Sequence, residues 1–147
     1  MLTNKFKINY SIGAVANGIK TDTFTFFLLF FYSNIIGLNP ALAGSAIFIA
    51  LCVDAVTDPL MGTISDRTNS SYGRRHPFMM ISFIPMSLGY IFLFAPRQDW
   101  DMSQSDLFIW MTIFTVITRI GMTLFDIPHR AFGGEVTKNY KERTILM

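Results

Sequence analysis

The sequence predicts an all-α membrane protein with about four transmembrane helices, and two observations carry this prediction. Only 15% of the 147 residues are charged and 51% are hydrophobic, whereas an ordinary soluble domain has about a quarter charged residues. The apolar residues also form four long stretches, of which residues 78–94 contain no charge. One helical crossing needs roughly 20 mostly apolar residues. Four crossings therefore use most of the chain, which excludes a soluble enzyme.

The crossings are expected at residues 8–36, 42–65, 77–95 and 105–131. The first begins polar and ends apolar and aromatic, and a tight turn is expected at residues 37–40, where Gly, Asn and Pro occur together. Pro77 fits the first turn of the third helix, where its missing N–H costs nothing, and Pro96 closes that helix. Ser103 or Ser105 is expected to cap the fourth helix.

The positive charges predict the orientation in the membrane. Lysine and arginine gather on the cytoplasmic side of membrane proteins. Arg97 lies on one side of the predicted crossings, and eight basic residues lie on the other: Lys5, Lys7, Arg67, Arg74, Arg75, Lys138, Lys141 and Arg143. The sequence thus predicts an inner-membrane protein whose N-terminus, second loop and C-terminal tail are cytoplasmic, with an even number of crossings.

We expect residues 1–147 to form one transmembrane region, with all four crossings, of a longer protein. Residues 144–147 resemble the start of another apolar run that is cut short. The formal net charge of +2 gives no support to nucleic-acid binding. The expected partners are the lipid bilayer and a small-molecule substrate.

Two acids in the second crossing indicate a cation site. A charge at the centre of a bilayer costs roughly 2.5–3.5 kcal/mol on insertion scales, so such a residue must face protein or a wet cavity. Asp54 and Asp58 are four residues apart and share one helix face. Pro59 predicts a kink that frees the carbonyl of Ala55. This group of oxygens suits Na⁺ or H⁺. The alternative is that arginines of other helices neutralise the pair. A transport cycle can also use the two arrangements in turn.

The fourth crossing carries a polar stripe. Arg119, Thr123, Asp126 and Arg130 fall at i, i+4, i+7 and i+11, on one helix face. This spacing favours a cavity that Thr123 and Asp126 share with the two acids of the second crossing. The alternative is an internal ladder in which Asp126 pairs with Arg130. In the first crossing, Asn17 and Lys20 lie on one face and are the candidates there for a common pocket.

Three motifs carry a family resemblance: residues 54–62 (DAVTDPLMG), 65–68 (SDRT) and 72–78 (YGRRHPF). Together they resemble the glycoside–pentoside–hexuronide:cation symporters of the major facilitator superfamily, the melibiose-permease type. Residues 28–32, 123–128 and 140–144 match the same family in order. The resemblance covers the whole chain and implies the N-terminal part, about the first third, of a twelve-helix transporter.

The resemblance implies a secondary active transporter, not an enzyme, for symport of a sugar, glycoside or related solute with Na⁺ or H⁺. No cofactor, and no metal beyond the transported cation, is implied. Asp54 and Asp58 would bind the cation with help from Thr123, and Asp126 would contact the sugar. The second loop resembles the cytoplasmic gating motif of the superfamily, with charge pairs among Asp66, Arg67, Arg74 and Arg75.

The chain departs from the melibiose-type pattern at the substrate site. Asn17 and Gly18 stand where those permeases have a lysine–aspartate pair, and Arg130 stands where they have an aromatic ring. Asn17, Lys20, Asp126 and Arg130 are our candidate substrate-binding residues, and the arginine suggests an anionic substrate.

Three alternatives to a sugar symporter stay open. One is a lipid or other amphiphile transporter of the same superfamily, and another is a small four-helix membrane protein that acts as an oligomer. A membrane enzyme with paired aspartates is disfavoured, because Asp58 is followed by proline and no further acidic motif with metal-ligand spacing is present.

Overall fold

The protein is helical throughout the part of the chain that the computed structural model describes, residues 24–68, 70 and 75–136. A helical segment Phe24–Ile36 ends in the π-helical turn η1 (Phe31–Ile36). It is followed by α2 (Pro40–Arg67), α3 (His76–Ile81), α4 (Phe83–Leu93), the short 3₁₀ turn η2 (Gln98–Trp100) and α5 (Gln104–Val136).

Three helical lengths within the described residues are long and apolar enough to cross a membrane: Pro40–Arg67, His76–Leu93 and Gln104–Ala131. Phe24–Ile36 is a shorter apolar helix, and the preceding part of the crossing expected at residues 8–36 lies outside the described residues. The prediction of an all-α membrane protein with several spans is therefore confirmed.

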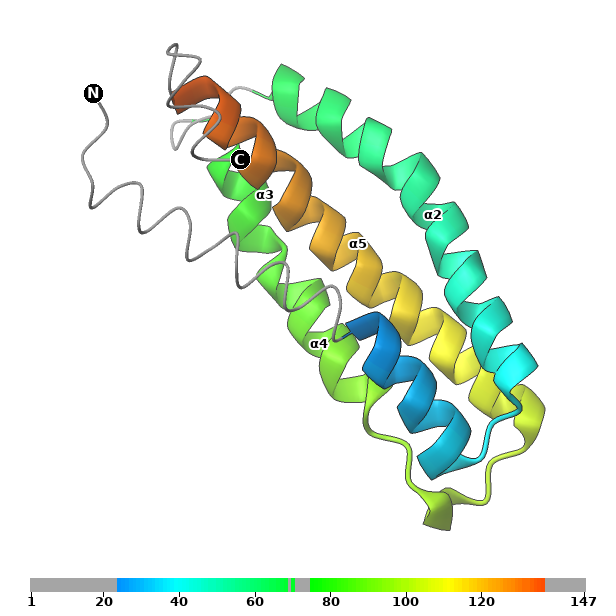
Figure 1. The fold of residues 1–147 in the computed structure, drawn as a ribbon. Helices are drawn as coiled ribbons and strands as arrows, with labels where there is room; N and C mark the ends of the chain where they lie inside the picture. The colour runs from blue at the N-terminus through cyan, green and yellow to red at the C-terminus, as the bar shows by residue number, and fades with distance from the viewer. Residues whose placement is uncertain (1–23, 69, 71–74, 137–147) are drawn as a thin grey trace.

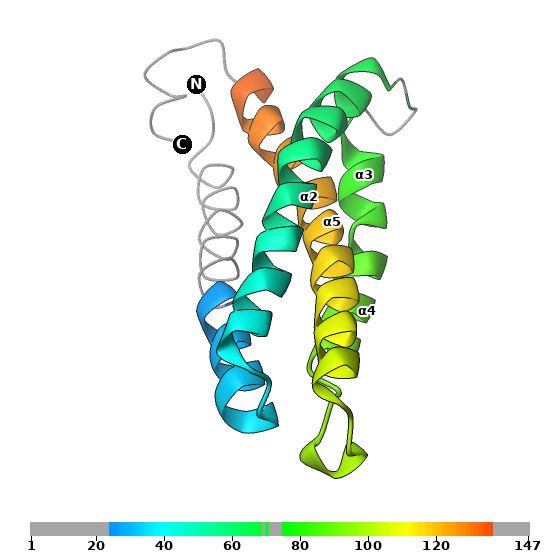
Figure 2. The ribbon, with the colours of Figure 1, turned by 90° about the vertical axis from the view of Figure 1, so that its right-hand side faces the viewer.

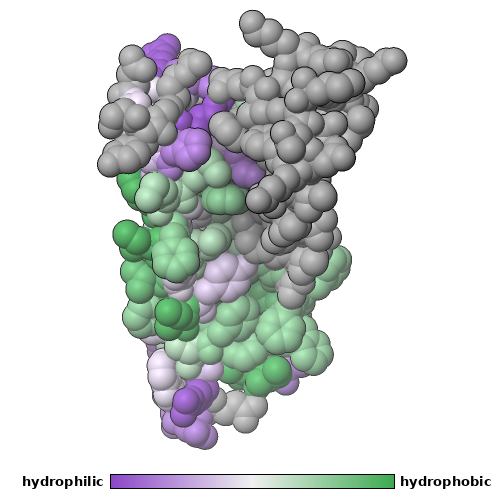
Figure 3. Space-filling model, turned by 90° about the vertical axis from the view of Figure 1, so that its left-hand side faces the viewer, coloured by the Kyte–Doolittle hydropathy of each residue, from purple (hydrophilic) through white to green (hydrophobic). Residues whose placement is uncertain are grey.

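The helix α5 is the centre of the bundle. It runs between α2 on one side and α3 with α4 on the other (Figures 1 and 2). The segment Phe24–Ile36 lies beside α2 and also contacts α4, to which it is joined through Tyr32 and Leu93. Because α3 and α4 return the chain between them, α2 and α5 run in the same direction. Figure 3 shows apolar side chains over the middle of one face and polar side chains at both ends, the distribution that a bilayer requires.

The third crossing, predicted as one helix over residues 77–95, is helical over His76–Leu93 and is interrupted only at Ser82, which keeps helical backbone angles. One helix ends at Ile81, the next begins at Phe83, and Ser82 lies between them. Pro85 explains the break, because it has no N–H to donate to the carbonyl of Ile81 and its ring crowds that carbonyl. The Ser82 hydroxyl donates to the carbonyl of Met79 at 2.7 Å. The two pieces still form one apolar crossing.

The turn predicted at residues 37–40 is present and is attached to the start of α5. Gly37 has a φ of +86°, which glycine adopts without steric cost. The Asn39 side chain accepts the N–H of Ala41 at 2.9 Å and caps α2. The Gln104 amide accepts the N–H of Asn39 at 2.8 Å and donates to the carbonyl of Gly37 at 2.9 Å. One side chain thus fixes the loop against α5.

Of the two serines proposed as a cap for α5, Ser103 takes the role. Its hydroxyl accepts the N–H of Asp106 at 3.2 Å and donates to the Asp106 carboxylate at 2.7 Å, a reciprocal capping arrangement. Pro59 and Pro128 lie inside α2 and α5. Neither can donate to the carbonyl four residues before it.

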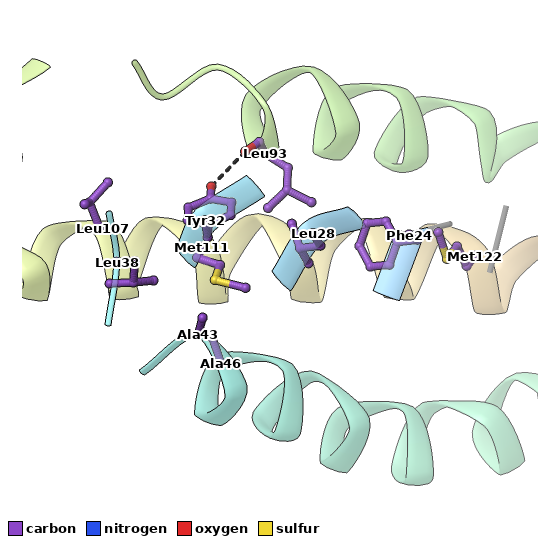
Figure 4. Packing of buried hydrophobic residues seen from close by; sticks show 10 residues of the cluster. All are labelled: Phe24, Leu28, Tyr32, Leu38, Ala43, Ala46, Leu93, Leu107, Met111 and Met122. Atoms are coloured by element: carbon purple, nitrogen blue, oxygen red, sulfur yellow. Dashed lines mark hydrogen bonds between the residues drawn. The ribbon is translucent and has the colours of Figure 1, made fainter. Parts of the chain in front are cut away.

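The buried apolar core joins the segment Phe24–Ile36, α2, α4 and α5 (Figure 4). The Tyr32 hydroxyl donates to the carbonyl of Leu93 at 2.7 Å, and the Trp110 indole donates to the carbonyl of Phe92 at 2.9 Å. These carbonyls belong to the last turn of α4, where a helix leaves its carbonyls without intrahelical partners; the Phe92 carbonyl also accepts the N–H of Ala95 at 3.3 Å. The core residues drawn in Figure 4 are Phe24, Leu28, Tyr32, Leu38, Ala43, Ala46, Leu93, Leu107, Met111 and Met122.

The helices α4 and α5 approach one another through glycine. A Cβ atom placed on Gly121 would lie 2.7 Å from the backbone nitrogen of Met86. A Cβ on Gly89 would lie 2.3 Å from the Thr118 hydroxyl oxygen and 3.0 Å from the Thr118 Cα. Small residues permit this close approach of two membrane helices. The contact fixes α5 against α4, so that its polar stripe faces α2.

Candidate functional site

A polar cavity of about 140 Å³ lies between α2 and α5. Most of its lining comes from the two stripes that the sequence singles out. Asp54 and Asp58 belong to α2, and the remaining lining residues belong to α5: Arg119, Met122, Thr123, Asp126, Ile127 and Arg130. Both helices belong to the apolar spans, so the cavity places charged groups at membrane depth.

Asp54 forms an ion pair with Arg119. An Arg119 terminal nitrogen donates to Asp54 Oδ2 at 2.7 Å, and the side chains of Arg119 and Asp54 are only 13% and 18% exposed respectively. The guanidinium also lies over the ring of Phe24, 5.7 Å from its centroid, within the range of a cation–π interaction. The arrangement in which an arginine of another helix neutralises a helix-two acid is thus present at Asp54.

Asp58 has a different partner. The Thr123 hydroxyl donates to Asp58 Oδ1 at 2.8 Å. This contact and the ion pair both join residues that are 65 positions apart. The separation is constant because α2 and α5 run in the same direction. Asp54 and Asp58 are four residues apart on α2, about one helical turn, and so are Arg119 and Thr123 on α5. The two acids, although alike in sequence, therefore have unlike surroundings.

Asp126 and Arg130 line the same cavity as the two helix-two acids. The helical spacing predicted this arrangement for Asp126, and the structure brings the residues together. Asp126 is partly buried and Arg130 is exposed. Asn17 and Lys20, the candidates from the first crossing, lie outside the described residues.

At the other candidate region, the loop after α2, the structure joins two of the four predicted gating residues. Arg75 donates to the Asp66 carboxylate at 2.9 Å. The Arg75 side chain is 9% exposed, and that of Asp66 is 62% exposed. Arg67, the last residue of α2, is exposed, and Arg74 lies outside the described residues.

Arg119 is the site residue that our sequence reasoning left without a role. Its place in the stripe at i, i+4, i+7 and i+11 could have indicated the ion pair, because an arginine at membrane depth on the same face as Thr123 needs an acid nearby. The cavity lining holds three carboxylates and two guanidinium groups, which leaves one formal negative charge. This balance suits one monovalent cation.

The comparisons with known proteins identify the family. Residues 9–147 match the family model described as MFS/sugar transport protein. The chain is 36% identical to an uncharacterized symporter of Synechocystis sp., over 95% of this chain and 26% of that protein. It is 30% identical to the sodium-dependent lysophosphatidylcholine symporter 1-A of Danio rerio (97% and 26%) and 24% identical to the glucuronide carrier protein homolog of Escherichia coli (95% and 30%).

The chain thus spans between a quarter and a third of the length of these curated relatives. The family match covers both crossings that form the cavity, together with the loop that carries Asp66 and Arg75. The chain belongs to the glycoside–pentoside–hexuronide:cation symporter family of the major facilitator superfamily, a family of transporters rather than enzymes.

Proposed function

We propose that the chain is the N-terminal part of a secondary active transporter that couples the entry of a small solute to a cation, Na⁺ or H⁺. The observation that carries the proposal is the cavity in which Asp54, Asp58, Thr123 and Asp126 meet between two membrane-spanning helices. Ionisable groups at membrane depth are costly and mark ion and substrate pathways. The symporter names of the relatives support the same function.

In this proposal the cation binds at the two helix-two acids. Hard cations take oxygen ligands, and the Asp58 carboxylate and the Thr123 hydroxyl already lie 2.8 Å apart. Asp54, one turn away, supplies further oxygen atoms. Neutralising the acids favours substrate binding in the same cavity, and the coupling is reciprocal, so substrate also favours the cation.

The substrate binds beside the cation. Asp126 and Arg130 line the cavity next to the acids, and we assign Asn17 and Lys20 to the same site from their shared helix face. Substrate sites of such transporters lie near the bilayer midplane, and the two halves of the protein move around them.

The gating pairs lie on the cytoplasmic side of the inner membrane, where the positive charges place the N-terminus as well. The gating residues Asp66, Arg67, Arg74 and Arg75 hold one state closed. Ion pairs between exposed side chains contribute only about 0–1 kcal/mol; in the Asp66–Arg75 pair the carboxylate is exposed and the arginine is buried, so this proposal places the solvent-accessible side of the pair at Asp66. Asp66 is exposed and already paired with Arg75.

Replacing Asp58 by cysteine tests the cation site. In the complete natural protein, Asp58→Cys is expected to abolish cation-driven accumulation of substrate and to leave membrane insertion unchanged, because the variant loses a charged cation ligand. Uptake into cells with and without an imposed Na⁺ or H⁺ gradient measures this. Asp99→Cys, at an exposed position in η2, is the matched control and should transport normally. Persistence of concentrative uptake in Asp58→Cys would contradict the proposed cation site.

From Arg130 we assign the solute to the anionic class, such as a uronide or a sulfated or phosphorylated compound. Arg130 supplies a guanidinium group that binds carboxylates and phosphates in a bidentate manner. The complete protein in proteoliposomes should accumulate a glucuronide more readily than the matching neutral glycoside, and Arg130→Gln should remove the preference. Transport of neutral glycosides alone refutes the anionic class, and transport of a lysophospholipid alone favours the amphiphile alternative.

A further inference from the structure

The ion pair between Asp54 and Arg119 is incompletely satisfied. One hydrogen bond of 2.7 Å joins the two groups. Asp54 Oδ1 and Arg119 Nε are both buried and have no hydrogen-bonding partner within the part of the chain that the structure describes. Arginine and a carboxylate commonly form two parallel bonds. The pair therefore leaves one acceptor and one donor unused where each costs free energy.

A buried ion pair that leaves polar atoms without hydrogen bonds contributes little net stability to the protein. Desolvation of the two charges offsets most of their attraction unless further hydrogen bonds complete the geometry. At Asp54 they do not, because Oδ1 has no donor. A small cation in the adjoining cavity would supply the charge that Asp54 needs and would also engage the unused oxygen.

We propose that Arg119 is a tethered competitor of the coupling cation: its guanidinium neutralises Asp54 until the cation displaces it. This inference rests on the proposed function, because it assumes that the cation binds at Asp54 and Asp58. Arg119 lowers the affinity of the site for the cation, and it does so through Asp54 rather than through Asp58, which Thr123 contacts instead.

The surroundings of Arg119 fit such an exchange. The guanidinium that leaves Asp54 keeps the ring face of Phe24, 5.7 Å from its centroid, as a favourable contact. Because Phe24 belongs to the first helical segment, Arg119 keeps a contact between that segment and α5 after it leaves Asp54.

Binding of radioactive sodium ions to the purified complete protein, at fixed pH and in the absence of substrate, tests the inference. Arg119→Gln should bind sodium at least about tenfold more tightly than the natural protein. Arg119→Lys keeps the competing charge and should bind close to the natural protein. In the double variant Asp54→Asn with Arg119→Gln the gain should disappear, because the gain depends on a free Asp54.

Arg97→Gln, at an exposed arginine in the loop before α5, is the matched control and should bind sodium as the natural protein does. Equal or weaker binding by Arg119→Gln, or a gain that survives removal of Asp54, overturns the inference, as does failure of every variant to bind sodium. The Asp58→Asn variant distinguishes failure of the proposed cation site from failure of the tethered competitor. If sodium binding survives that substitution, the proposed cation site fails; if it is lost while Arg119→Gln shows no gain, the tethered competitor alone fails.

Discussion

Replacing Gly121 by alanine is expected to disrupt the packing of α4 against α5 and to destabilise the complete protein by about 3 kcal/mol, the upper part of the usual range for overpacking. The new Cβ would lie 2.7 Å from the backbone nitrogen of Met86. Because the obstructing atom is backbone, the clash is relieved only if the two helices move apart. Thermal unfolding in detergent measures the loss, and Gly89→Ala should act in the same direction through Thr118.

Gly44→Ala is the matched control for this pair of substitutions. Gly44 lies inside α2, and a Cβ there would meet nothing within 4 Å. Alanine favours helix over glycine by about 1 kcal/mol, so this variant should be as stable as the natural protein or more so. Equal stability of the Gly121→Ala and Gly44→Ala variants would show that α4 and α5 do not touch through their backbones.

Removing one member of the buried ion pair should be the second large effect. Asp54→Leu leaves the Arg119 guanidinium at membrane depth without its acid, and stranding one charge of a buried pair costs about 3–5 kcal/mol. The expected result is a marked fall in the unfolding temperature of the complete protein in detergent. Asp99→Leu, at an exposed residue of η2, should leave that temperature nearly unchanged.

The double variant Asp54→Leu with Arg119→Leu distinguishes the effect of an unpaired buried charge from the effect of lost side-chain packing. Replacement of a whole buried ion pair by apolar residues is often neutral or stabilising, so the second substitution should restore most of the lost stability. A double variant as unstable as Asp54→Leu would mean that the pair contributes packing rather than charge balance.

Much of the architecture follows from local sequence. Apolar length alone predicts the crossings, because the bilayer sets one requirement that every span must satisfy. The turn at residues 37–40 and the cap at Ser103 also follow from their own residues, since their hydrogen bonds are made largely within a few positions. The break at Ser82 was missed, although Pro85 supplied a local reason for it.

For the site, helical spacing put Asp54 with Asp58, and Thr123 with Asp126, because residues one turn apart share a face whatever the rest of the protein does. What these residues do in transport stays a prediction. Only the tertiary structure decided which acid receives Arg119 and which receives Thr123, because that depends on the offset of 65 residues between α2 and α5. The offset depends in turn on how closely α5 approaches its neighbours, which the glycine contact with α4 permits. Sequence periodicity describes the faces of one helix at a time, whereas the partner of a side chain across a cavity depends on the relative positions of two helices.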